Sequence, residues 1–258
     1  IAYPCPAHTG RALTAADTRV ASPSQAGNLQ NLIDGDPATE VIFDGTPEVA
    51  FDFTANADLD LRNITVWPAH RPIRAAVELL AKEAGGYRTV ASFEIDRSNP
   101  NIEVGFDPYA PVAISVDRVT GREFRIVVRG AGRDTGFKEV LLSSEPRVER
   151  YAEKTFAKMF QTPLPYWEEY QWRDQPVLDD ASLAVDPAKV IDMTECLDGD
   201  RLEWEAPAGD WVVMRTGMRP TGMQNSPAAP EGTGLEVDKM TSAYLQHHFD
   251  AFIGEVEE

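Results

Sequence analysis

Apolar and polar residues alternate in short segments between residues 9 and 146, and turn residues separate these segments. Large apolar residues fall at every second position in 49–53 and again in 124–128. Because successive side chains of a strand point to opposite faces, one face of each segment is expected to be buried. Gly85-Gly86 marks a hairpin. The pattern predicts an antiparallel β-sandwich. Its expected strands are 48–53, 62–67, 75–82, 89–94, 110–117, 123–128 and 137–143.

The hydrophobic period changes after Pro146. Apolar residues recur at three- and four-residue steps from Val148 to Phe160, which predicts a helix that ends before Pro163. Residues 163–186 are rich in Pro, Trp, Tyr and acidic residues and follow neither period, so we expect an ordered surface loop there. Three strand-like runs follow, at 190–193, 202–204 and 211–216.

A loop rich in Gly and Pro, residues 217–237, precedes a last predicted helix that begins near Thr241. Leu245 and Phe249 start its apolar stripe, which Phe252 and Val256 would continue, and Thr241 or Asp238 can cap its amides. Strand, loop and helix form the repeating unit of βα barrels and sheets. We therefore expect part of an α/β domain after the sandwich.

The composition narrows the class of protein. The chain has 258 residues, 43% of them hydrophobic, which permits a buried core and excludes overall disorder. Its 42 acidic and 24 basic residues give a formal net charge of −18, which disfavours nucleic acid as a partner. No apolar run approaches the roughly 20 residues that span a membrane. The chain opens with Ile1 instead of Met, so we expect a piece of a longer protein.

Two acidic segments could supply catalytic or metal-binding side chains. Glu236 and Asp238, with Lys239 beside them, follow a predicted strand and precede a helix, where barrel enzymes place catalytic groups. The alternative is a helix N-terminus whose acids complement the helix dipole. The run from Asp34 to Thr39 is dense in the oxygen ligands that calcium prefers, and the alternative is an ordinary Asp-Gly turn.

The remaining motifs carry weaker signals. The loop 67–71 is aromatic and basic and can stack on a sugar ring, but the favoured interpretation is that Trp67 is a core residue and the rest is a turn. Cys5 and Cys196 are too few for a disulfide scaffold, so we expect two buried free thiols, with a bridge between them as the alternative. The sequence contains no P-loop, dinucleotide-binding fingerprint or nucleophile elbow. This disfavours enzymes that act on phosphates or bind dinucleotides.

Residues 12–145 resemble the galactose-binding-like, discoidin-type sandwich. The similarity lies in the run Asp34-Gly35-Asp36-Pro37-Ala38-Thr39 and in a closing strand that contains Phe137-Lys138-Glu139-Val140. The sequence departs from that family at Val41, where Trp is usual, and this bears on sugar binding more than on the fold. The resemblance implies a structural calcium ion. It assigns the ligands to Asp34, Asp36, Thr39 and Glu139.

A second resemblance covers the two ends of the chain. The opening 1–4, the run 202–217 and the run 232–239 are similar to glycoside hydrolase family 106, the α-L-rhamnosidases. That family implies a sandwich inserted in an incomplete (β/α) barrel. The expected domains are therefore the end of a barrel strand at 1–8, the jelly-roll sandwich at 9–146, and a linker helix with part of the catalytic barrel at 147–258.

The same resemblance implies a reaction. It is the calcium-assisted, inverting hydrolysis of terminal α-L-rhamnose in glycans, in a secreted or periplasmic enzyme. Glu236 is then expected as one of the two catalytic carboxyl groups, the acid, with Asp238 and Lys239 binding or orienting substrate. The second carboxyl group is expected in the remaining parts of the barrel, beyond Glu258. The alternative function is a sandwich module that binds carbohydrate or only braces the barrel, without catalysis.

Overall fold

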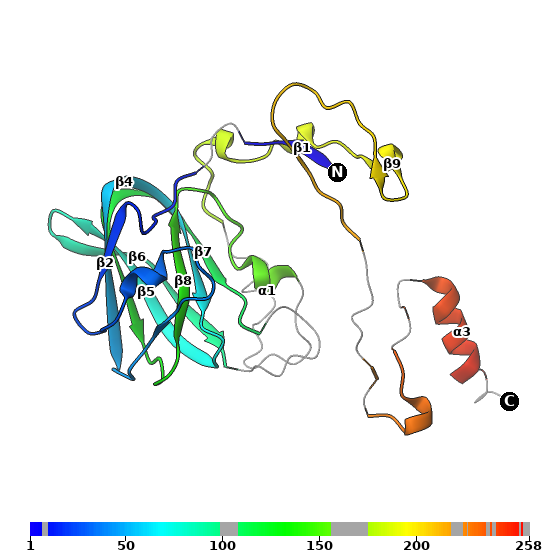
Figure 1. The fold of residues 1–258 in the computed structure, drawn as a ribbon, viewed down its shortest axis with the longest axis horizontal. Coiled ribbons are helices and arrows are strands. Elements are labelled where there is room, and N and C mark those ends of the chain that lie inside the picture. The colour runs from blue at the N-terminus through cyan, green and yellow to red at the C-terminus, as the bar shows by residue number, and fades with distance from the viewer. Residues whose placement is uncertain are drawn as a thin grey trace. The chain divides into compact units, whose positions relative to one another are not determined.

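The computed structural model describes residues 1–6, 10–98, 108–155, 175–217, 224–225, 227–235, 238, 241–252 and 254 (Figure 1). Contacts divide the chain into two units, Ile1–Val213 and Met214–Glu258. Within the described ranges, no helix is both long and apolar enough to cross a membrane.

The first unit contains a seven-stranded antiparallel assembly. The seven predicted strands are confirmed as parts of five longer ones, because 48–53 and 62–67 join into one strand and 110–117 and 123–128 into another. Two short strands were not predicted. The strands are β2 (Thr18–Ala21), β3 (Val41–Ile42), β4 (Glu48–Pro68), β5 (Ile73–Glu83), β6 (Gly86–Arg97), β7 (Val112–Arg129) and β8 (Gly136–Ser143).

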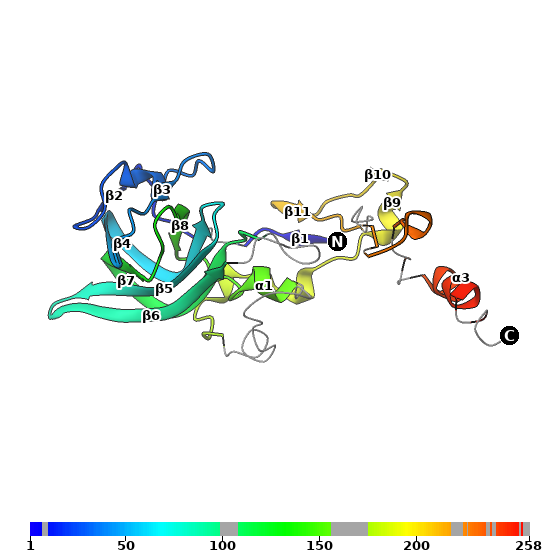
Figure 2. The same ribbon diagram turned by 90° about the horizontal axis from the view of Figure 1, so that it is seen from below.

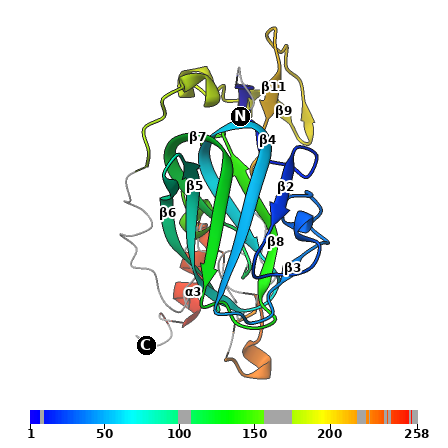
Figure 3. The same ribbon diagram turned by 90° about the vertical axis from the view of Figure 1, so that its left-hand side faces the viewer.

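Strands β4 and β7 pair with each other along most of their length and belong to both layers of the sandwich (Figure 3). The first part of β4 pairs with β2, and the last part of β7 pairs with β5, which pairs with β6. The last part of β4 pairs with β8, which pairs with β3. The register of β4 shifts between Thr54 and Leu59 and again between Leu61 and Asn63. Such irregularities bend a strand and allow it to pass from one layer to the other (Figure 2).

The core lies between the two layers and is rich in aromatic rings. The ring centroids of Phe43 and Phe137 are 5.1 Å apart in an edge-to-face arrangement, and those of Phe43 and Phe51 are 6.0 Å apart. Phe53 and Phe124 are also fully buried. These residues occupy the inward positions of the alternating pattern, so the predicted buried face is confirmed. Closely packed aromatic pairs contribute beyond the apolar area that they bury.

The segment that follows the sandwich differs in part from its prediction. Helix α1 (Tyr151–Thr155) begins within the predicted helix, and residues 156–174 lie outside the described part of the chain. The expected strand at 190–193 is wrong, because only Ile191 forms an isolated bridge, with Ala2. The other two runs are confirmed as shorter strands, and the chain adds one that was not predicted. These strands are β9 (Leu197–Asp198), β10 (Arg201–Leu202) and β11 (Trp211–Val213).

The opening residues pair with the returning chain. Strand β1 (Ala2–Pro4) runs antiparallel to β11, with Ala2 opposite Val213 and Pro4 opposite Trp211. Adjacent strands of a (β/α) barrel are parallel, whereas every strand pair between described residues is antiparallel. The described residues therefore show a β-sandwich and small antiparallel sheets, and the barrel stays a prediction.

The second unit contains helix α3 (Ser242–Phe252), close to its predicted start at Thr241. The Thr241 hydroxyl donates a hydrogen bond to the Asp238 carboxylate at 2.6 Å, and the Tyr244 and Leu245 amides donate to the Thr241 carbonyl. Leu245 and Phe249 are exposed in the structure, so the predicted apolar stripe has no core to face within the described residues.

Candidate cation site and sugar-binding surface

The acidic loop Asp34–Thr39 follows a short 3₁₀ turn, Leu29–Leu32, whose two leucines anchor it in the core. The Thr39 hydroxyl lies 3.0 and 3.1 Å from the two carboxylate oxygens of Asp34 and 3.1 Å from the Asp36 carbonyl oxygen. The Asp36 carboxylate instead accepts a hydrogen bond from the Ala38 amide at 2.9 Å. The loop thus gathers side-chain and main-chain oxygens around Thr39.

Glu139 reaches this loop from β8. Its carboxylate accepts a hydrogen bond from the Gly35 amide at 3.3 Å, across 104 positions of sequence. Burial raises the pKa of Glu139 to about 7; the Gly35 hydrogen bond opposes this rise, and the negative charge of Asp34 adds to it. The structure therefore brings the four expected ligand residues together, with Asp36 offering its carbonyl oxygen.

These residues fit calcium on chemical grounds. Two carboxylates whose charges repel each other lie beside a hydroxyl and main-chain carbonyls, which is the hard-oxygen set that calcium takes. No three His, Cys, Asp or Glu side chains of the described residues cluster closely enough to hold a metal by themselves. A cation here would therefore depend on hydroxyl and carbonyl oxygens from the loop. Asp34, Thr39 and Glu139 would hold it, and its charge would join the loop to β8.

The predicted catalytic segment is described only in part. Glu236 and Lys239 lie outside the described residues, and Asp238 is exposed. Before them, the Asn225 side chain accepts a hydrogen bond from the Gly234 amide at 2.9 Å and donates one to the Gly232 carbonyl at 2.9 Å. Gln224 and Leu235 form a β-bridge. The segment is thus folded back on itself just before Glu236, and the roles of Glu236, Asp238 and Lys239 stay predictions.

In the segment 67–71, Trp67 and Pro68 end β4 and Ala69 is buried, whereas His70 and Arg71 are exposed. The His70 ring stacks on the Tyr109 ring, with centroids 5.4 Å apart and planes inclined by 18°. Beside them, the Arg71 guanidinium pairs with the Glu40 carboxylate at 3.1 Å. Trp67 is partly buried, and stacking of this loop on a sugar ring stays a prediction. Tyr109 and Glu40 escaped the sequence analysis because each lies in a separate loop with no pattern of its own.

The two cysteines are free thiols, as expected. Cys5 is exposed and Cys196 is partly exposed, so the expectation that both are buried is wrong. Cys5 follows β1, where its amide donates a hydrogen bond to the Asp210 carbonyl. We therefore assign neither cysteine a disulfide, metal-binding or catalytic role.

An antiparallel sandwich with an oxygen-rich loop and a partly exposed ring stack beside a paired arginine is consistent with a carbohydrate-active protein. The chain belongs to the α-L-rhamnosidase family, glycoside hydrolase family 106, whose family model matches residues 1–258.

Two further comparisons concern the fold and a stretch of local sequence. The structure of a rhamnosidase from Novosphingobium sp. PP1Y is similar over 96% of this chain and 24% of that one, with a TM-score of 0.51 and 22% identity. A Formosa agariphila protein named as a proposed β-glucuronidase is 42% identical over 66 residues, which are 25% of this chain and 6% of that protein. The chain thus spans a small part of each of these relatives.

A third likeness concerns the sandwich. A family 32 carbohydrate-binding module from C. perfringens, solved with galactose, is similar over 53% of this chain and all of its own, with a TM-score of 0.44 and 14% identity.

Proposed function

We propose that this chain forms part of a glycoside hydrolase that removes terminal α-L-rhamnose from glycans by an inverting, calcium-assisted reaction. The observation that carries the proposal is the match of the α-L-rhamnosidase family model to residues 1–258. The fold shared with a solved rhamnosidase over 96% of the chain supports it. Because such glycans are met outside the cytoplasm, we place the reaction in the periplasm or outside the cell.

Glu236 is the proposed general acid. An inverting reaction needs a carboxylic acid that protonates the leaving oxygen and a carboxylate that activates water, roughly 6.5 to 9.5 Å apart. Glu236 follows a β-bridged segment and precedes α3, which is a position where a loop residue can face substrate. Asp238 and Lys239 would orient Glu236 or bind sugar hydroxyls. The carboxylate that activates water would come from the remaining parts of the catalytic barrel.

The apolar surface of the small sheets supports a further polypeptide partner. Ile1 and Val213, at the β1–β11 pair, are each nearly half exposed, and Leu197 and Leu202 of β9 and β10 are also exposed. A two-stranded sheet is marginally stable by itself, and exposed apolar side chains favour an interface. We propose that the remaining parts of the catalytic barrel cover these residues.

The test compares Glu236→Gln with Glu231→Gln, a matched change at an exposed glutamate five positions earlier, in an enzyme preparation that hydrolyses methyl α-L-rhamnopyranoside, whose alcohol leaving group must be protonated. We expect Glu236→Gln to lose at least about a hundredfold in kcat, because general acid catalysis contributes at least that factor. Glu231→Gln should retain activity. Proton NMR should show the β-anomer of rhamnose as the first product. Equal activity of the two variants, or the α-anomer first, would overturn the proposed role or the inversion.

A second candidate function is favoured by the stack of the exposed His70 ring on the partly buried Tyr109 ring. An aromatic face beside the Arg71–Glu40 pair can receive the C–H face of a sugar while the charged groups bind its hydroxyls. In this case the sandwich would bind carbohydrate without catalysis. Titration of the chain with a panel of monosaccharides should give saturable binding that His70→Ala weakens. If no sugar binds, the sandwich only braces the rest of the protein.

A further inference from the structure

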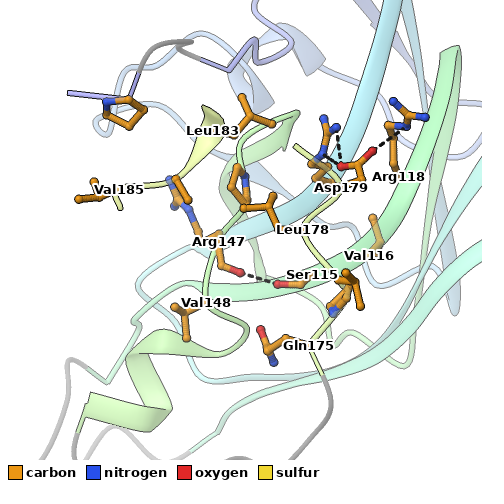
Figure 4. Close-up of a pocket in the computed structure, with 16 residues that line it drawn as sticks. Ser115, Val116, Arg118, Arg147, Val148, Gln175, Leu178, Asp179, Leu183 and Val185 are labelled. Atoms are coloured by element: carbon orange, nitrogen blue, oxygen red, sulfur yellow. Dashed lines mark hydrogen bonds and ion pairs between the residues drawn. The ribbon is translucent and has the colours of Figure 1, made fainter. Parts of the chain in front are cut away.

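A hollow of about 460 Å³ lies where the returning chain, residues 175–185, passes the sandwich (Figure 4). Its wall is mainly apolar, with Val116 of β7 and Pro146 on the side of the sandwich. The returning chain adds Pro176, Leu178, Leu183 and Val185. Pockets of this volume hold whole small molecules, so the hollow has room for more than one apolar side chain of a partner.

Two apolar side chains of this hollow are largely exposed to solvent. Val177 is 90% exposed and Val148 is 59% exposed. Exposed apolar side chains that gather around a concave surface typically mark a site of contact with another molecule, because covering them removes apolar area from water. The hollow is therefore a surface that a partner would stabilise by covering it.

Three charged side chains of the lining are paired with one another. The Asp179 carboxylate accepts hydrogen bonds from Arg62 Nε at 3.0 Å and Arg62 Nη2 at 2.8 Å, and it lies 3.2 Å from Arg118 Nε. Figure 4 shows Asp179 and Arg118 on one side of the hollow, whereas Val148 and Val185 lie on the other. The ion pairs thus form one edge of an apolar surface.

The remaining polar side chains of the lining also have partners within the chain. The Ser115 hydroxyl donates a hydrogen bond to the Arg147 carbonyl, and the Arg147 guanidinium lies 5.8 Å from the centroid of the Tyr151 ring. The Gln175 side chain accepts a hydrogen bond from the Glu149 amide at 2.9 Å. Small-molecule sites use a few polar groups to orient the ligand, whereas an apolar centre beside a polar rim is typical of an interface between polypeptides. The lining therefore favours a polypeptide partner.

Pro6 connects the hollow to a second exposed apolar surface. It lines the hollow and follows β1 by two residues, and the Cys5 amide between them donates a hydrogen bond to the Asp210 carbonyl beside β11. At the β1–β11 pair, Ile1 and Val213 are each nearly half exposed, so one partner can cover both surfaces. The rhamnosidase of similar fold is matched over only 24% of its length. Most of a polypeptide of that length lies outside this chain and is long enough to supply the partner.

We propose that this hollow is a docking site for the remaining parts of the catalytic barrel, which place apolar side chains against Val148 and Val177. The inference rests on the proposed function for the existence of that barrel, and it adds the surface of the sandwich that the barrel contacts. The paired charges of Arg62, Arg118 and Asp179 border the contact. The contact holds the sandwich and the returning chain together against the barrel.

The experiment measures how fast a thiol at position 177 reacts with N-ethylmaleimide. Val177→Cys is made in the chain of residues 1–258 and in the longer polypeptide that carries the barrel, and mass spectrometry of the peptides that contain this position follows the modification. Because Val177 is 90% exposed in the chain, the substitution should not disturb folding. We expect labelling at least about tenfold slower in the longer polypeptide, since a covered thiol reacts only when the contact opens.

Arg88→Cys is the control, because Arg88 is half exposed on the β5–β6 hairpin and is absent from the lining of the hollow. Its thiol should react at the same rate in both polypeptides. Equal rates for Val177→Cys in both polypeptides, or equal slowing at positions 88 and 177, would overturn the proposal. Slower labelling of Val177→Cys in the chain alone as its concentration rises would assign the hollow to a second copy and would overturn it as well.

Val177→Asp gives a second measurement. A carboxylate brought into an apolar contact loses its hydration, so this change should lower the melting temperature of the longer polypeptide by several degrees and leave that of the chain alone unchanged. An unchanged melting temperature of the longer polypeptide would contradict the contact. Both measurements report the contact whether or not the polypeptide hydrolyses rhamnosides, so failure of the docking is distinguishable from failure of the proposed reaction.

Discussion

The Arg97 guanidinium and the Glu153 carboxylate form an ion pair in which Arg97 Nη2 lies 2.7 Å from Glu153 Oε1, and both side chains are almost completely buried. Arg97 ends β6 and also donates to the Ala110 carbonyl, and Glu153 lies in α1, where Arg150 approaches the same oxygen at 3.3 Å. Through this pair the segment after the sandwich is fixed to the sandwich. The second oxygen, Oε2, is buried with no hydrogen-bond partner among the described residues.

Removing one member of this ion pair should lower the stability of the folded chain. Glu153→Ala breaks a buried ion pair by removing one partner, which typically lowers the free energy of unfolding by about 3 kcal/mol or more. Chemical denaturation monitored by circular dichroism measures the change. The double variant Arg97→Met, Glu153→Leu should recover most of the loss, because two apolar side chains need no partner. A loss in the double variant as large as in Glu153→Ala would contradict this account.

Gly136 is a second sensitive position, at the start of β8. A Cβ atom there would overlap the Val41 carbonyl oxygen of β3 and approach Ile42 Cα at 3.0 Å. Gly136→Ala should therefore disrupt the β3–β8 pairing and lower the free energy of unfolding by about 1 to 3 kcal/mol. Gly132→Ala is the control, because its Cβ would meet only Thr135 Cγ2, at 3.8 Å. Equal stability of the two variants would show that β3 moves aside freely.

The pKa of Glu139 predicts a dependence of stability on pH in the absence of calcium. Its folded-state pKa of about 7 lies above the ordinary value of 4.5, so the folded chain binds more protons than the unfolded chain between these pH values. The stabilising contribution is therefore present below pH 4.5 and is lost as the pH rises through 7. Glu139→Gln should flatten the profile of unfolding free energy across this window, whereas exposed Glu195→Gln should not. If the unfolding free energy depends on pH in the same way for Glu139→Gln and for the unmodified chain, the pKa of Glu139 is not raised in the folded state.

Calcium should stabilise the chain through the acidic loop. A ligand that binds only the folded state adds about 2.7 kcal/mol at a concentration a hundred times its Kd, so calcium should raise the melting temperature and a chelator should reverse the rise. Asp34→Asn should abolish the effect. Asp44→Asn is a matched control, since Asp44 lies in a similar Asp-Gly-Thr turn and accepts a hydrogen bond from the Thr46 amide. If calcium leaves the melting temperature of the unmodified chain unchanged, the loop holds no calcium.

Local pattern was sufficient to predict most of the sandwich. Alternation in 49–53 and 124–128 placed the inward residues correctly, because the two faces of a strand differ in burial wherever the strand lies. The residues between 53 and 62 were predicted to separate two strands. In the structure β4 continues through them with shifted register, because β7 runs beside it and supplies partners on both sides of the bend.

The candidate cation site could be predicted only in part. The density of oxygens in the Asp34–Thr39 loop is visible in the sequence, and the resemblance to a known sandwich family supplied Glu139. The raised pKa of Glu139 could not be predicted, because it arises from burial and from the charge of Asp34 across a distance that the fold closes. The His70–Tyr109 stack is a similar case, since its two rings come from separate loops.

The sequence by itself determined the five long strands of the sandwich, the hairpin at Gly85-Gly86, the start of α3 and the family, because each depends on periodicity or on motifs within a short stretch of chain. The tertiary structure alone decided which distant charges meet. Arg62 and Asp179 are separated by 117 positions and Arg97 and Glu153 by 56, yet each pair forms a hydrogen-bonded contact. Such contacts depend on how strands bend and where the chain returns, and no local pattern of polar and apolar residues encodes that geometry.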